Sequence, residues 1–153
     1  MKLLLLTVGR LKSRPHEELL SDYLRRIARI CPVSHETVRE TKEKDPESMR
    51  TSEGERILKA LAPRDSVVLL DEKGQMMTSM DMAKWLSHKM GSSKGRLCLV
   101  VGGAYGVSAS VRERADETMA LSLMTLPHDL CLVVLAEQVY RALSILNGSP
   151  YHH

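Results

Sequence analysis

The sequence predicts a single α/β domain over residues 1–153, with a mostly parallel sheet covered by helices on both faces. Continuous apolar runs at 2–9, 65–74 and 96–103 are typical of strands buried on both faces. They alternate with stretches of helical spacing, which is the pattern of parallel strands joined by crossover helices. A chain of 153 residues has the length of one domain.

The first half of the chain predicts two strands and two helices. A strand over residues 2–9 is followed by an amphipathic helix over 16–30 and a weakly alternating strand over 33–40. The charged stretch 41–50 predicts a loop. Ser52 and Glu55 have the spacing of a capping box, which predicts a helix through Leu61.

The second half continues the alternation. Residues 65–74 predict a strand that ends in a polar turn, and Ser79 predicts the cap of a helix toward Met90. A strand over 96–103, a short helix capped by Ser108 and a strand over 119–127 follow. The helix over 129–148 is apolar nearly all the way round, which predicts burial on several sides and indicates a partner subunit.

Composition excludes several classes of protein. The longest apolar runs fall short of the ~20 residues of a membrane span, and residues 2–6 are too short for a signal peptide, so we expect a cytoplasmic protein without membrane contact. Three separated cysteines and scattered histidines predict neither a disulfide framework nor a metal site. A net charge of +3 permits an anionic partner, but four tyrosines, one tryptophan and no phenylalanine are too few for a base-stacking sheet.

Three strand ends are candidates for ligand binding. The turn GGAYG at 102–106 matches neither a dinucleotide fingerprint nor a phosphate loop, but its glycines permit close approach of a ligand to the backbone. Residues 121–129 and 69–74 add small polar groups and carboxylates. Each segment is also explained as an ordinary turn.

Three further features draw attention. Pro150 makes the exit from the last helix rigid and presents Tyr151 and His152, although a frayed end explains the tail equally well. Arg141 lies among apolar neighbours, where it suits a phosphate or simply pairs with Glu137. A basic cluster suits an RNA backbone, although such a face is also typical of solvated helices. Its members are Arg10, Lys12, Arg14, Arg25, Arg26 and Arg29.

Taken together, several segments resemble the RlmH family along the whole chain. They are VGRLK, LLDEKG, VVGGAYG, LSLMTLPHDL and EQVYRALSILNGSPYHH. The resemblance implies a SPOUT-class methyltransferase with a C-terminal trefoil knot, acting as a homodimer. It also implies that the cofactor is S-adenosylmethionine. The implied target is N3 of a pseudouridine in a stem-loop of 23S ribosomal RNA, within the ribosome.

The resemblance also assigns residues. Its cofactor contacts fall on Leu70, Gly103, Ser122, Leu123, Met124, Thr125, Leu126 and Pro127. Tyr151, His152 and Arg141 are the expected catalytic residues, with the tail reaching the partner subunit's site, and the general base is left open among them. Arg10, Lys12, Arg25, Arg26 and Arg29 are the expected RNA contacts. A non-catalytic ribosome-binding factor is the alternative, and the missing phosphate-loop lysine disfavours a nucleotide hydrolase.

Overall fold

The computed structural model describes residues 2–92 and 94–153, in which a parallel sheet of five strands has the order β2-β1-β4-β3-β5. The strands are β1 (Leu3–Val8), β2 (Val33–Val38), β3 (Ser66–Met76), β4 (Leu97–Val101) and β5 (Glu117–Ala120). The helices are α1 (Arg14–Ala28), α2 (Pro46–Ala60), α3 (Ser79–Ser92), α4 (Ala109–Arg114) and α5 (His128–Leu146). The predicted α/β class with a parallel sheet is confirmed.

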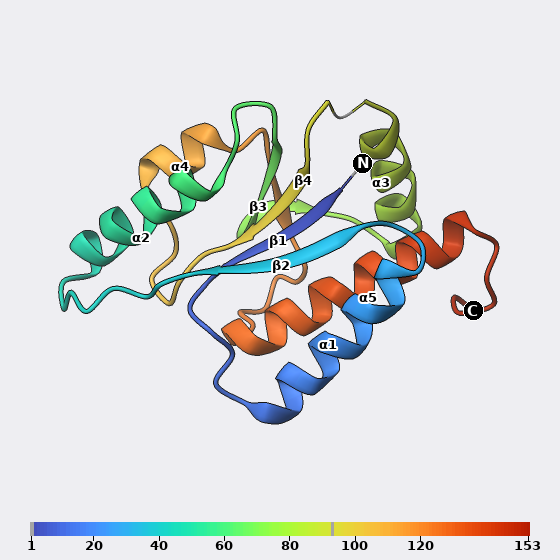
Figure 1. Cartoon of the computed structure of the whole chain (residues 1–153), viewed down its shortest axis with the longest axis horizontal. Helices are drawn as coiled ribbons and strands as arrows, with labels where there is room; N and C mark the ends of the chain where they lie inside the picture. Colours follow the sequence, from blue (N-terminus) through green and yellow to red (C-terminus); the bar gives the residue numbers. More distant parts are fainter. Residues whose placement is uncertain (1, 93) are drawn as a thin grey trace.

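Helices cover both faces of the sheet, as Figure 1 shows. All of β1 is buried because its side chains alternate between two cores. Leu3 and Leu5 pack with α1, α3 and α5, whereas Leu4 and Leu6 pack with α2 and α4. The continuous apolar run therefore marks a strand that is covered on both sides.

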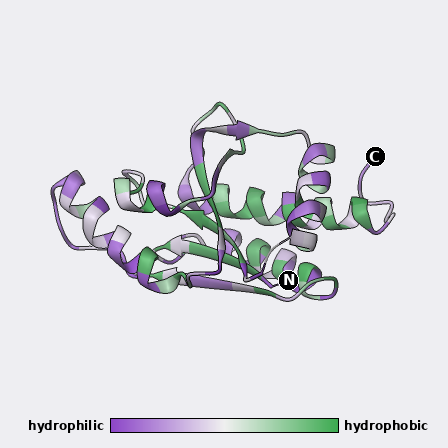
Figure 2. Ribbon diagram, turned by 90° about the horizontal axis from the view of Figure 1, so that it is seen from above, coloured by the Kyte–Doolittle hydropathy of each residue, from purple (hydrophilic) through white to green (hydrophobic). Residues whose placement is uncertain are grey.

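Helix α5 lies between α1 and α3 against the sheet (Figure 1). Leu132, Leu135 and Val139 are each at most 1% exposed in this core, and hydrophobic colouring follows the helix in Figure 2. The apolar circumference of α5 is thus largely explained by neighbours within one chain. Evidence for a partner subunit has to come from other surfaces.

Two helix starts differ from the predictions. The capping box at Ser52 is wrong, because α2 begins at Pro46 and Asp45 accepts a hydrogen bond from the Ser48 N–H at 2.9 Å. An aspartate before a proline at the first helical position is itself a strong start signal. The cap of α3 is Thr78 rather than Ser79, since Thr78 Oγ1 accepts the Asp81 N–H at 3.1 Å. The Ser108 cap of α4 is confirmed.

The strand predicted over 119–127 is wrong beyond Ala120, where β5 ends and a loop begins. The polar turn predicted at the end of 65–74 is also wrong, because β3 continues to Met76. Its pairing with β5 shifts register between Leu70 and Gln75. A Cβ at Gly74 would lie 2.6 Å from the Met119 backbone, so only glycine permits this approach.

Within residues 2–92 and 94–153, no helix has the length and apolarity needed to cross a membrane. The same residues contain no cluster of His, Cys, Asp or Glu that would hold a metal ion. The trefoil knot remains a prediction from the family resemblance.

Candidate cofactor pocket and catalytic tail

A pocket of about 770 Å³ opens at the ends of β4 and β5, beside residues 70–73 of β3, where the pairing of β3 with β4 stops. Its volume lies in the range of small-molecule sites, ~300–1,000 Å³, and ligands of open parallel sheets bind at this edge. Most of the residues predicted to bind the cofactor line this pocket. They are Leu70, Gly103, Ser122, Met124, Thr125, Leu126 and Pro127. Leu123, from the same loop, is 82% exposed and lies beyond the lining. The three predicted strand ends therefore converge on one cavity.

The glycine turn after β4 forms one wall of this pocket. Gly106 has a φ of 81° and donates its N–H to the Gly103 carbonyl at 3.0 Å. A Cβ at Gly103 would overlap Oε2 of the buried Glu53 from α2. The turn is therefore closely backed by α2, and it presents main-chain groups to the pocket.

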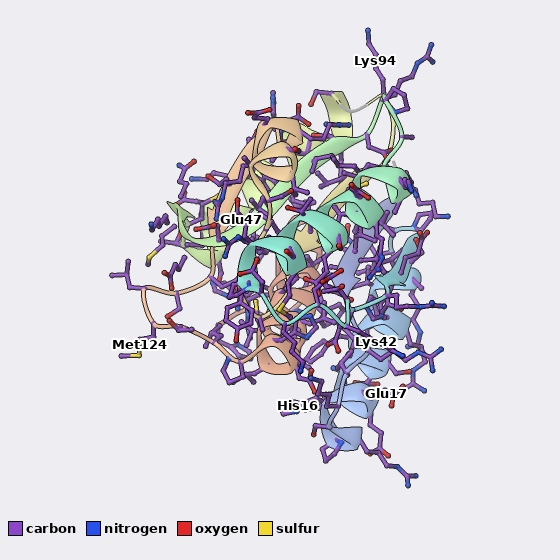
Figure 3. The ribbon with its side chains drawn as sticks, turned by 90° about the vertical axis from the view of Figure 1, so that its left-hand side faces the viewer. His16, Glu17, Lys42, Glu47, Lys94 and Met124 are labelled. Atoms are coloured by element: carbon purple, nitrogen blue, oxygen red, sulfur yellow. The ribbon has the colours of Figure 1, made fainter. Side chains whose placement is uncertain are left out.

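The loop after β5 forms the opposite wall. The Met124 N–H donates to Ser122 Oγ at 2.9 Å, and Thr125 Oγ1 donates to Glu72 Oε2 at 3.2 Å. Figure 3 shows Met124 at the tip of a loop that projects from the body of the molecule. Met124 is 79% exposed, and its neighbour Leu123 is exposed to a similar degree. Two large apolar side chains therefore lie in solvent beside the pocket.

Charged side chains of both signs stand along the pocket. Arg112 from α4 contacts Asp71 with its Nη1 2.6 Å from Oδ2. Burial alone raises the pKa of Asp71, but hydrogen bonds from the Lys73 N–H and the Arg112 guanidinium bring that pKa below its usual value. Asp71 is therefore a carboxylate at neutral pH.

The predicted catalytic residues meet at the other end of α5. One oxygen, Glu137 Oε1, accepts hydrogen bonds from Arg141 Nη2 at 2.6 Å, Arg141 Nε at 3.0 Å and the Tyr151 hydroxyl at 3.1 Å. Arg141 Nη1 lies 3.4 Å from His152 Nδ1. We call Glu137, Arg141, Tyr151 and His152 the tail cluster.

The Tyr140 ring and the Arg141 guanidinium pack against the half-buried Tyr151. Its ring centroid lies 4.8 Å from that of Tyr140, and the Arg141 guanidinium lies 4.7 Å from it. Burial, with the hydrogen bonds to Tyr23 and Glu137, raises the pKa of Tyr151 well above its usual value. Tyr151 therefore stays a neutral phenol at physiological pH.

Within one chain, the tail cluster and the pocket are far apart. Cys131 lines the pocket nearest to the tail cluster, and Arg141 follows it by 10 residues along α5. At ~1.5 Å per residue, this places them about 15 Å apart along the helix. The structure therefore brings the predicted catalytic residues together, but it does not bring them to the pocket of the same chain.

The predicted basic surface divides into two parts. Arg10 and Lys12 follow β1, and the Lys12 N–H bonds Asp129 at the pocket end of α5. The other three arginines come near the end of α1 (Arg25, Arg26 and Arg29). Arg26 lies over the Tyr23 and Tyr140 rings at 5.5 and 5.8 Å, which joins this part to the tail cluster.

Sequence reasoning missed Arg112, His128 and Cys131, which also line the pocket. His128 stands in the TLPH motif, and Arg112 lies one turn beyond the Ser108 cap, so both were detectable from position. Burial raises the pKa of the Cys131 thiol, which keeps it protonated and poorly nucleophilic.

Sequence comparison identifies the class of protein. The model for predicted SPOUT methyltransferases matches residues 1–152, and the chain belongs to this family. It is similar to proteins named ribosomal RNA large subunit methyltransferase H. That of Bacteroides fragilis is 40% identical, with 100% of this chain and 99% of the relative covered. That of Desulfovibrio desulfuricans is 44% identical, with 97% and 95% covered.

Proposed function

We propose that this protein transfers a methyl group from S-adenosylmethionine to N3 of a pseudouridine in a 23S ribosomal RNA stem-loop. We place the reaction on the assembled ribosome in the cytoplasm. The observation that carries the proposal is the pocket, which is built from the segments that the family resemblance assigns to the cofactor. Full-length relatives named as ribosomal RNA methyltransferases support the substrate class.

The pocket has the chemistry that S-adenosylmethionine needs. Apolar side chains such as Leu70 and Leu126 suit the flanks of an adenine, while main-chain groups of the glycine turn suit its edges. The lining carboxylates Asp71 and Glu72 suit the cationic groups of the cofactor, and Arg112 suits its carboxylate. The absent side chain of Gly103 lets the turn pack directly on Glu53, which supports the main-chain groups that face the pocket.

S-adenosylmethionine supplies an electrophilic methyl group on a sulfonium sulfur. The chain's own task is to orient the target base in line with that methyl and to favour loss of its N3 proton. Arg141 and Tyr151 are the residues we assign to orientation and charge stabilisation. His152 lies next to Arg141 and completes the set.

We further propose that the active unit is a homodimer in which the tail of one chain serves the pocket of the other. No residue of the tail cluster lines the pocket of its own chain, and Arg141 lies about 15 Å beyond Cys131 along α5, which favours a second chain if tail and pocket work together. Leu123 and Met124 expose 82% and 79% of their surface beside the pocket, which suits a subunit interface.

The basic residues are assigned to the RNA backbone. Arg25 and Arg26 both pair with Asp22, at 2.5 and 2.6 Å, which holds the two guanidinium groups on one face of α1. Arg26 adjoins the tail cluster through Tyr23 and Tyr140, so an RNA held there approaches the tail. Arg29 belongs to the same part of the basic surface, whereas Arg10 and Lys12 form a second part at the pocket end of α5.

The test is transfer of labelled methyl from S-adenosylmethionine to ribosomes that lack this modification. Joined ribosomes are compared with free large subunits, and the product is mapped by mass spectrometry of RNA fragments. We expect methyl on N3 of one pseudouridine, with joined ribosomes preferred. Cofactor binding without transfer would contradict the substrate, and failure to bind the cofactor would favour a non-catalytic ribosome-binding factor.

A further inference from the structure

In the tail cluster, the chemistry of the side chains fixes which group donates and which accepts each hydrogen bond. Glu137 Oε1 can only accept, and it receives bonds from Arg141 and from the Tyr151 hydroxyl. Arginine can only donate, so the 3.4 Å contact between Arg141 Nη1 and His152 Nδ1 requires a lone pair on Nδ1. In neutral His152 the ring proton is then on Nε2.

Because the Nδ1 lone pair accepts the Arg141 N–H, His152 is disfavoured as a proton acceptor. Taking up a proton at Nδ1 would set an N–H against the N–H of Arg141, and Nε2 already carries hydrogen. Among residues 2–92 and 94–153, the contact with Arg141 is the hydrogen bond made by the His152 ring. Nε2–H is therefore the group that His152 offers to an outside molecule.

The other members of the cluster offer no base either. Tyr151 directs its hydroxyl proton to Glu137 at 3.1 Å and has a pKa above the usual range, while Arg141 stays charged. Glu137 Oε2 accepts from Gln138 Nε2 at 2.6 Å, and Gln138 Oε1 accepts from Ser79 Oγ at 2.7 Å, so both carboxylate oxygens are engaged. The cluster presents donors and positive charge.

We propose that Glu137 is a positioning residue that orients Arg141 and thereby makes His152 a hydrogen-bond donor to an oxygen beside N3 of the target base. This inference rests on the proposed function. The two carbonyl oxygens next to N3 carry the negative charge when the imide loses its proton. His152 Nε2–H and the Arg141 charge stabilise that anion.

The proposed step balances without a protein base. The N3 proton leaves to water or hydroxide, and the N3 lone pair forms the new bond to the methyl carbon. The bond from that carbon to sulfur breaks, and its electron pair neutralises the sulfonium. His152 keeps its own proton throughout.

The first test replaces the donor in the full-length protein. The amide of His152→Gln is able to donate a hydrogen bond but is not basic, whereas His152→Ala has neither property. We expect kcat for ribosome methylation to fall less than about tenfold in His152→Gln and about 100-fold in His152→Ala. His153→Ala is the matched control at the neighbouring position. Equal loss in the Gln and Ala variants would overturn the donor role.

The pH profile gives a second, independent readout. With no protein base, the rate rises with pH through the usual histidine range, near ~6.5, and follows ionisation of the substrate. A plateau with a midpoint near that value in the wild type, absent from His152→Gln, would assign the base to His152. A wild-type protein that transfers no methyl group would instead refute the proposed function.

Glu137 itself is tested by Glu137→Gln. We expect a loss of about tenfold or more in kcat with unchanged cofactor affinity, because the amide loses the charge that pairs with Arg141. Its NH2 group also has to face a donor, either Gln138 Nε2 or the Arg141 and Tyr151 donors. The control is Glu18→Gln, which removes another i, i+4 pair, that between Arg14 and Glu18 at 3.1 Å. Equal activity of the two variants, or a Glu137→Gln effect confined to thermal stability, would contradict the positioning role.

Discussion

Replacement of Asp65 by asparagine is expected to weaken the fold without touching the pocket. Asp65 is 6% exposed and accepts hydrogen bonds from the Ala62 N–H at 2.7 Å and from Arg96 Nη2 at 2.6 Å. Burial alone raises the pKa of Asp65, but these bonds and the Arg96 charge lower it from 3.8 to about 2. This difference corresponds to about 2 kcal/mol of stability at neutral pH.

The sign of the pH dependence follows from the lowered pKa. The folded carboxyl binds its proton less readily than the unfolded one, so its stabilising effect is full above pH ~4 and is lost as the pH falls toward ~2. The free energy of unfolding is measured by urea titration with circular dichroism at pH 7, about 4 and about 2.5, at fixed protein concentration. Asp65→Asn should lose about 2 kcal/mol at pH 7 and flatten the profile below pH 4.

Glu18→Gln, at an exposed pair, is the control and should change stability by less than about 1 kcal/mol. An unchanged acid profile in Asp65→Asn would refute the reasoning, because the lowered pKa would then belong to another group. Methyl transfer per folded molecule should stay at the wild-type level.

Three further predictions concern the site. Gly103→Val should weaken S-adenosylmethionine binding in calorimetry by about tenfold or more, because the new side chain overlaps Glu53; Gly91→Val, which meets nothing within 4 Å, should leave affinity unchanged. The double variant Arg25→Glu, Arg26→Glu should bind ribosomes more weakly and with a smaller salt dependence, at unchanged cofactor affinity. Ribosome binding equal to that of the wild type would show that neither arginine contacts the RNA. Leu123→Glu should shift sedimentation from dimer to monomer, and a persistent dimer would place the interface elsewhere.

The central layers of the fold are predictable from sequence because apolar patterning is a local signal. The run of leucines in β1 requires cover on both faces, and the structure provides it. Errors arose where tertiary pairing overrides local polarity. The polar end of the segment 65–74 predicts a turn, yet β3 continues through it to Met76 because β5 pairs with Gln75 and Met76 after a change of register.

The candidate site also has parts that local sequence patterns predict and parts that depend on contacts between distant segments. The pocket wall at Gly103 and the loop with Thr125 were expected from strand ends, since carboxyl ends of parallel strands share one edge. The pairing of Asp71 with Arg112 joins distant segments, and no local pattern reports it. The resemblance supplied Arg141, Tyr151 and His152, and the helical spacing offered Glu137 as a partner of Arg141. The hydrogen bond from Tyr151 to the same carboxylate joins the tail to α5, and no local pattern predicts it.

The most direct test of the account is complementation between two impaired variants. His152→Ala is impaired in its tail and Gly103→Val in its pocket, and the assay uses an S-adenosylmethionine concentration that leaves the Gly103→Val pocket largely empty. Co-expression with different affinity tags and purification on both tags isolates the heterodimer. If the tail of one chain serves the partner's pocket, one of its two sites is intact, and about half the wild-type methylation rate per dimer is expected. A rate no higher than that of either variant alone would contradict a site shared between chains.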